Sequence, residues 1–194
     1  KINIILFIVG LLFISMNNIY GQAAIDIPLT LTDNQGGTKQ LRFGLDPAAT
    51  NNIDPALGES DLPPFPPTGV FEARWTLNFA PISLNLSSYW DYRNAPAFPF
   101  TGPVTHRILW QYSEFATSMT FTYNLPVGAE MVITSNNSTP LWTTGTLTGS
   151  GTYVLSDPDN EYTAARVFVT YTNIAPIVLG PAIDLAPSSL AFGN

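Results

Sequence analysis

Apolar and polar residues alternate over several segments of this chain. Ile25, Ile27, Leu29 and Leu31 occupy every second position of one segment, and residues 71–79 and 119–123 repeat the pattern with aromatic side chains. Successive side chains of a β-strand point to opposite faces of the sheet, so each segment would have one buried and one solvated face. These segments therefore predict half-buried antiparallel strands.

Five further segments have strand-like composition: residues 39–45, 105–112, 130–135, 146–155 and 163–172. Clusters of Gly, Asn, Asp, Ser and Pro separate them, and residues 33–37 predict the turn of a hairpin. Residues 24–194 show no helical periodicity. We expect an all-β fold over residues 24–179, a single antiparallel β-sandwich of jelly-roll or immunoglobulin-like (Ig-like) type.

Two long connections interrupt the strands. Residues 44–69 are rich in proline, but their spaced apolar side chains predict a loop pinned across a sheet. Residues 87–103 form a second irregular stretch that is rich in aromatic residues.

The N-terminus has the pattern of an export signal. Lys1 precedes an apolar run over residues 4–14, which as a helix would reach about 16 Å, half of a ~30 Å hydrocarbon core. Small residues follow at Gly21 and Ala23. Residues 1–23 are thus predicted to be a signal-peptide helix, cleaved after Ala23 or, alternatively, after Gly21; a membrane anchor or a buried core helix is the other interpretation. The expected localisation is secreted or cell surface, with membrane contact only during export.

Composition excludes several classes of function. The formal net charge is −7 and no segment gathers Lys and Arg, which disfavours nucleic-acid binding. The chain has no cysteine and one histidine, His106, which excludes thiol chemistry and the usual zinc sites. His106 lies in a strand with apolar neighbours, and we expect it to be structural.

We expect no catalytic residues. A Gly-x-Ser-x-Gly elbow is absent from the sequence. The alternative is a secreted, glycosidase-like hydrolase, or its accessory domain, that uses a carboxylate pair drawn from Glu72, Glu114 and Glu130.

The segment around residue 90 is the predicted ligand-binding site. Aromatic faces stack on sugar rings and neighbouring polar groups bond hydroxyls, so Tyr89, Trp90, Tyr92 and Arg93 could bind a surface glycan. The alternative is that these side chains fold back as a plug over one end of the sandwich. A protein partner is the other expectation for this surface.

Structural calcium is the only cofactor that the sequence suggests. Asp157, Asp159 and Glu161 place carboxylates at alternate positions of a turn, and calcium prefers six to eight oxygen ligands from flexible loops. Residues 46–61 form a second oxygen-rich stretch. Side chains that bond their own backbone would explain both stretches without a metal.

Two segments carry family resemblances. Leu41–Pro47, Ile53–Glu59, Leu62–Pro64, Pro66–Pro67 and Phe71–Arg74 together resemble an N-terminal module of large secreted bacterial proteins that often end in a type IX secretion sorting domain. This resemblance implies export and implies no particular activity.

The tail, Ile183–Asn194, resembles the first strand of a Hydin-type, ASH-like immunoglobulin repeat. It implies that residues 180–194 form a linker and the first strand of a following Ig-like domain. Together these features predict a non-catalytic extracellular module with a structural, adhesive or assembly role in a larger secreted protein.

Overall fold

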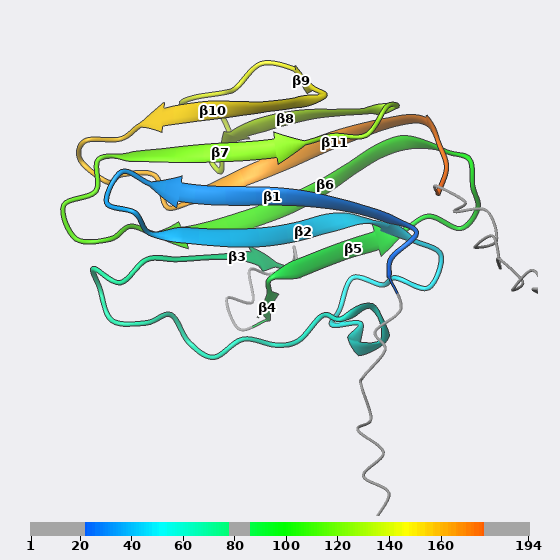
Figure 1. The fold of residues 1–194 in the computed structure, drawn as a ribbon, viewed down its shortest axis with the longest axis horizontal. Helices are drawn as coiled ribbons and strands as arrows, with labels where there is room; N and C mark the ends of the chain where they lie inside the picture. Colours follow the sequence, from blue (N-terminus) through cyan, green and yellow to red (C-terminus); the bar gives the residue numbers. More distant parts are fainter. Residues whose placement is uncertain (1–21, 78–85, 177–194) are drawn as a thin grey trace, which may run out of the picture.

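Two β-sheets stacked face to face make up the described part of the chain (Figure 1). The computed structural model describes residues 22–77 and 86–176. Its strands and single 3-10 helix are β1 (Ile25–Asp33), β2 (Thr38–Asp46), η1 (Pro55–Leu57), β3 (Glu72–Thr76), β4 (Ser87–Ser88), β5 (Trp90–Asn94), β6 (Phe100–Gln111), β7 (Ser118–Asn124), β8 (Ala129–Ser135), β9 (Leu147–Thr148), β10 (Ser150–Ser156) and β11 (Ala164–Ile174). The prediction of an all-β sandwich is confirmed. The predicted signal-peptide helix and the predicted strand of a following domain lie almost wholly or wholly outside the described residues.

One sheet has five strands in the order β10-β7-β1-β2-β5, and the other has six in the order β4-β3-β6-β11-β8-β9. Neighbouring strands are antiparallel except for β2 and β5, which run parallel. Residues 87–94 serve both sheets, because only Tyr89 separates β4, at the edge of one sheet, from β5, at the edge of the other.

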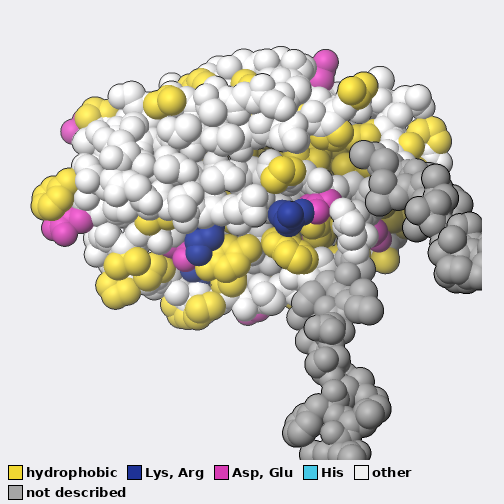
Figure 2. Space-filling model, in the orientation of Figure 1, with side chains coloured by type: hydrophobic (Ala, Val, Ile, Leu, Met, Phe, Trp, Pro, Cys, Tyr) yellow, Lys and Arg dark blue, Asp and Glu magenta, His cyan; other side chains and the backbone are white. Residues whose placement is uncertain are grey.

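The alternating pattern explains the core. Ile27, Leu29 and Leu31 point inward from β1 and are almost completely buried, as are Trp75 and Trp110 from the facing sheet. Large apolar side chains from both inner faces therefore fill the space between the sheets. On the face of the molecule that Figure 2 shows, where the five-stranded sheet lies in front, charged side chains are few.

All eight predicted strand segments are confirmed within the described residues, with ends that differ by a few residues; positions 78–79 of one segment lie outside the described part of the chain. The predicted hairpin joins β1 and β2 with full antiparallel register. The interpretation of residues 87–103 as irregular is wrong in part, since they contain β4, β5 and the start of β6. β4 and β5 were missed because their residues are buried on nearly all sides, so an apolar–polar alternation is not needed there.

The long loop before β3 is pinned across the six-stranded sheet, as predicted. The Leu62 amide donates to the Ser87 carbonyl at 3.0 Å, and the Arg74 guanidinium donates to the Pro63 carbonyl at 2.6 Å. Glu59 accepts the Tyr92 amide at 2.7 Å through one carboxylate oxygen and the Asp54 amide at 2.9 Å through the other. Backbone and side-chain bonds thus hold the loop along its whole length.

Candidate functional site

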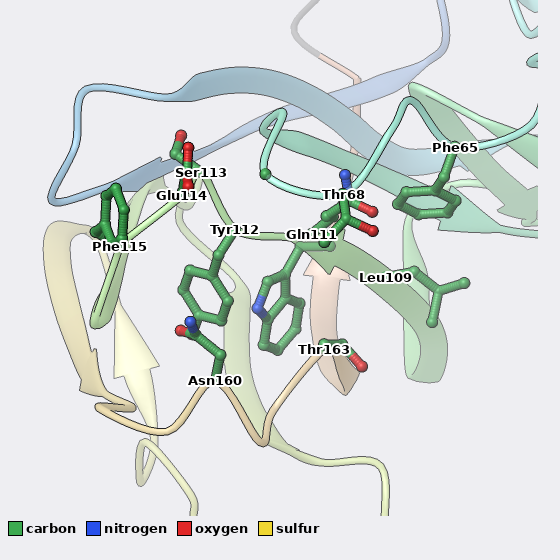
Figure 3. Close-up of a pocket in the computed structure, with 12 residues that line it drawn as sticks. Phe65, Thr68, Leu109, Gln111, Tyr112, Ser113, Glu114, Phe115, Asn160 and Thr163 are labelled. Carbon is green, nitrogen blue, oxygen red and sulfur yellow. The ribbon is translucent and has the colours of Figure 1, made fainter.

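A pocket of about 720 Å³ lies at the end of β6, between the loop before β3 and the loop before β11 (Figure 3). Its lining residues are Phe65, Thr68, Gly69, Leu109, Trp110, Gln111, Tyr112, Ser113, Glu114, Phe115, Asn160 and Thr163. The pocket forms here because β11 begins opposite Leu109, so the last residues of β6 have no neighbouring strand on that side.

The first wall of the pocket is the loop around Phe65, which two side chains of the sheet hold in place. The Gln111 amide donates to the carbonyl oxygens of Pro67 and Val70 at 2.8 Å each. The Arg74 guanidinium lies 4.1 Å from the centre of the Phe65 ring, a cation–π contact. Phe65 is therefore fixed at the pocket edge and does not move freely with its loop.

The second wall is a tight turn that exposes an aromatic ring. The Ala116 amide donates to the Ser113 carbonyl at 3.1 Å, which closes a turn with Phe115 at its third position. Phe115 has a φ of 65° and is 79% exposed. A bulky residue rarely adopts positive φ, and such strain costs about 1–3 kcal/mol. The turn is thus a strained backbone that presents a large apolar ring to solvent.

The β1–β2 hairpin clamps this turn from one side. Buried Asp33 accepts the Ser113 amide at 2.8 Å, and its other carboxylate oxygen accepts the Gln35 and Gly37 amides. Asn34 exchanges two hydrogen bonds of 2.9 Å with Thr117. Both ends of the turn are fixed, so the backbone that carries the Phe115 ring is held in place before any ligand arrives.

Beside the pocket, Tyr112 follows the end of β6 with its ring near Asn160 (Figure 3), and Trp110 of β6 belongs to the core between the sheets. Their rings lie perpendicular to each other with centroids 6.5 Å apart, and both residues are almost fully buried. Burial raises the pKa of the Tyr112 hydroxyl well above its ordinary value, and the nearby Asp157 carboxylate acts in the same direction. Tyr112 therefore remains a neutral hydroxyl in solution.

Rings of Phe65, Tyr112 and Phe115 stand beside hydroxyl, amide and carboxylate groups of Thr163, Asn160, Glu114 and their neighbours. A concave site with apolar walls and a few polar groups is typical of small-ligand recognition, and this mixture suits a sugar. Glu114 is the one carboxylate among the described lining residues. A glycosidase pair would need a second carboxylate facing it.

The four residues predicted to bind a ligand do not form one exposed surface. Tyr92 and Arg93 are buried, whereas Tyr89 and Trp90 are half-buried. The Tyr89 ring lies under the Lys39 ammonium at 4.3 Å, and a Cβ added to Gly58 would overlap the Trp90 ring. This arrangement matches the alternative interpretation, in which these side chains fold back against the sandwich.

His106 and its partners form a buried ionic cluster between the sheets. Its Nδ1 lies 2.7 Å from the Asp91 carboxylate, which also pairs with the Arg93 guanidinium at 2.9 Å. Phe43 and Trp75 pack on the imidazole with centroids 5.2 and 5.5 Å away. His106 is 0% exposed and thus has the structural placement that its strand neighbours predict.

The predicted calcium ligands do not converge. Asp157 is buried, and its carboxylate accepts the amides of Glu161 at 2.9 Å and Tyr162 at 3.0 Å, while Asp159 and Glu161 are exposed. Within residues 22–77 and 86–176, no group of three or more His, Cys, Asp or Glu side chains could hold a metal ion. The turn is explained by the side-chain-to-backbone bonds of Asp157.

The three candidate hydrolase carboxylates lie in different surroundings. Glu72 is buried and pairs with Lys39 and Arg74 at 3.7 and 3.8 Å. Glu114 lines the pocket, and Glu130 is exposed on β8.

Sequence reasoning missed Phe65, Tyr112 and Phe115. The useful signal was the Ser113–Ala116 segment, where a large apolar residue follows two polar ones between strands. Comparison of the chain with protein-family models, with curated proteins and with solved structures found no match.

Proposed function

We propose that this chain is a non-catalytic, extracellular glycan-binding module with an adhesive role in a larger secreted protein. The observation that carries this proposal is Phe115, an exposed ring on a strained, hydrogen-bonded turn at the rim of an aromatic pocket. A strained and exposed aromatic residue has no role in the core, whereas an exposed ring on a fixed backbone suits stacking on a sugar.

Export is the second part of the proposal. It rests on the apolar N-terminal run, on the resemblance to secreted bacterial modules and on the low charge of the chain. Ala23 is buried against Ala49, Leu57 and Tyr92, which favours cleavage after Gly21, because that cut would leave Ala23 in the folded domain. In the described part of the chain, none of the helices has the length and apolar character to cross a membrane.

The direct test is retention on immobilised polysaccharides by affinity electrophoresis. The unmodified chain should be retarded in gels that contain a polysaccharide it recognises, with xylan, mannan, dextran and polygalacturonate as a first panel. Phe115→Ala should lose that retardation, because it removes the stacking ring without touching the core.

Val154→Ala is the matched control, since Val154 is also an exposed apolar residue but lies on β10, away from the pocket. Val154→Ala should keep full retardation. Absence of retention across the panel, or equal retention by Phe115→Ala and the unmodified chain, would contradict the proposal.

A further inference from the structure

Strand β10 forms one edge of the five-stranded sheet (Figure 1). It pairs with β7 over its full length, and no described residue bonds to the backbone on its other side. At the opposite side of the molecule, the edge strands β5 and β4 are covered by the loop before β3, which bonds to them at Glu59, Ser60 and Leu62. The fourth edge strand, β9, has only two residues. Within the described residues, β10 is therefore the long strand edge that has no partner.

Hydrogen bonds at the two ends of β10 show which of its backbone groups are free. The Leu125 amide donates to the Gly149 carbonyl at 2.8 Å, and the Asp157 amide donates to the Thr117 carbonyl at 2.9 Å. Hydrogen-bonded pairs alternate along an antiparallel ladder, so the odd-numbered residues between Gly149 and Asp157 also bond to β7. The amides and carbonyls that point to the free edge are therefore those of the even-numbered residues, Ser150, Thr152, Val154 and Ser156.

This edge lacks the features that usually keep strand edges from pairing. β10 contains no proline and no charged residue, and β7, the next strand of the sheet, contains none either. The side chains of Thr152 and Val154 are exposed, and Val154 is 60% exposed. The edge thus offers free backbone groups beside an uncharged, accessible surface.

Residues 152–156 lie away from the ends of the described ranges. Gln22 and Pro176 line one pocket with Pro126, which follows the last residues of β7. β10 ends beside the start of β7, at the other end of that strand. Residues 77 and 86 flank β3 and β4, at the far edge of the other sheet. The described residues therefore define this part of the edge.

We infer that β10 pairs with β10 of a second copy of this chain, antiparallel and across a two-fold axis, so that two five-stranded sheets join into one continuous sheet. Charge favours a second copy as the occupant. The chain carries a formal net charge of −7, and two copies repel each other least where strands without charged residues meet. A two-fold contact also requires a surface that is complementary to itself.

A two-fold axis at Tyr153 supplies that complementarity. Thr152 then lies opposite the partner's Val154, and Ser150 lies opposite the partner's Ser156. These are the residues whose backbone groups point to the free edge, so each pair exchanges two hydrogen bonds, about eight in all. Two β-branched side chains, of Thr and Val, meet on the exposed face, and such cross-strand pairs stabilise a sheet. No pair brings like charges together.

The test is sedimentation equilibrium of the full chain at concentrations of about 5–500 µM. The mean mass should rise from 21.1 kDa toward about twice that value as the concentration increases. Amide hydrogen exchange on the same samples locates the contact. Exchange at Thr152 and Val154 should slow as the dimer forms, whereas Tyr153 and Leu155 should be protected at every concentration, because their amides already bond to β7.

Two variants block the edge in different ways. Thr152→Pro removes an amide that points away from β7, which an edge strand tolerates, and Val154→Asp adds a negative charge that each copy brings close to the other. Each variant should weaken self-association at least about tenfold. Val70→Asp is the matched control, since Val70 is 51% exposed but lies in the loop before β3, and it should dimerise normally. A thermal melt of each variant confirms that it is folded.

A constant mass of 21.1 kDa across the whole concentration range would overturn the inference. A dimer that persists in both variants, or one that leaves exchange at Thr152 and Val154 unchanged, would also overturn it, because another surface would then join the two copies. The result does not depend on polysaccharide binding, since the residues that line the pocket around Phe115 do not belong to β10.

Discussion

Asp91 bridges the two sheets through His106, with its carboxylate 2.7 Å from the imidazole Nδ1 in the interior of the sandwich. Asp91 belongs to β5 in one sheet and His106 to β6 in the other. The same carboxylate holds Arg93, whose guanidinium also donates to the Leu77 carbonyl at 3.2 Å and to Asn51 at 3.0 Å. One acidic side chain thus organises a polar island in an otherwise apolar core.

Removal of that carboxylate should be costly. Asp91→Ala would leave Arg93 buried without its counter-ion, and such a loss lowers the free energy of unfolding by about 3–5 kcal/mol. Urea denaturation followed by tryptophan fluorescence measures the change. Lys39→Ala, which removes a partly exposed ion pair, should cost less than about 1 kcal/mol. Similar losses in the free energy of unfolding for the two variants would show that the Asp91 cluster contributes little to the stability of the fold.

Glu59 should make the stability fall as the pH rises. Burial raises its pKa from 4.5 to about 7, so between these values the folded state binds more protons than the unfolded state. The contribution of Glu59 is therefore fully present below pH 4.5 and is lost as the pH rises through about 7, by at most about 3 kcal/mol.

Urea denaturation of the unmodified chain and of Glu59→Gln across this pH range tests the assignment. Glu59→Gln has nothing to titrate, so its profile should be flatter by the amount that Glu59 contributes. Parallel profiles would show that another group is responsible.

Phe115→Gly should separate stability from binding. Glycine adopts positive φ without strain, so this variant should gain about 1 kcal/mol in the free energy of unfolding while it loses polysaccharide retention. Phe115→Ala should lose retention as well but should gain less stability, because alanine keeps a Cβ. A less stable Phe115→Gly variant would mean that the Phe115 ring stabilises the fold by packing, and would contradict its role as an exposed ligand-binding ring.

Gln111→Ala should loosen the pocket wall. Its side-chain amide holds the Pro67 and Val70 carbonyls of the loop before β3. Hydrogen exchange should therefore accelerate at the Val70 amide, which donates to the Pro67 carbonyl, and at the Glu114 amide, which donates to the Gly69 carbonyl of the same loop. Gln40→Ala, an exposed position on β2, is the control and should leave exchange unchanged. Exchange rates that stay the same in both variants would assign the anchoring to Arg74 alone.

Chelation should leave the melting temperature unchanged. The Asp157 carboxylate already accepts two backbone amides, so the turn does not require calcium to neutralise it. A thermal melt with and without EDTA measures this directly. A fall of several degrees on chelation would revive Asp157, Asp159 and Glu161 as metal ligands.

The sequence predicted most of the fold because half-buried strands leave a visible period of two. Residues 25–31 show this plainly: each inward Ile or Leu is buried and each residue between them is partly exposed. β5 was missed because all of its central residues are buried. Asp91 and Arg93 form a buried ion pair, and Tyr92 packs against η1 and its flanking loop.

The site was harder to predict because its members are brought together by topology. Phe65, Tyr112 and Phe115 belong to a loop, the end of a strand and a turn, and no spacing in the sequence relates them. The aromatic residues near Trp90 predicted a binding site instead, but Tyr89 and Trp90 are half-buried and Tyr92 is buried, so these side chains pack against the sandwich.

The loop that crosses the six-stranded sheet also acts as a surrogate strand. Glu59 takes the amide hydrogen of Tyr92 on the free side of β5, and Ser60 and Leu62 bond to Ser88 and Ser87 of β4. Unpaired strand edges allow other chains to add on, so this segment shields the flank where β4 and β5 form the edges of the two sheets. Any variant that frees the segment should make the protein prone to edge-to-edge aggregation before it unfolds.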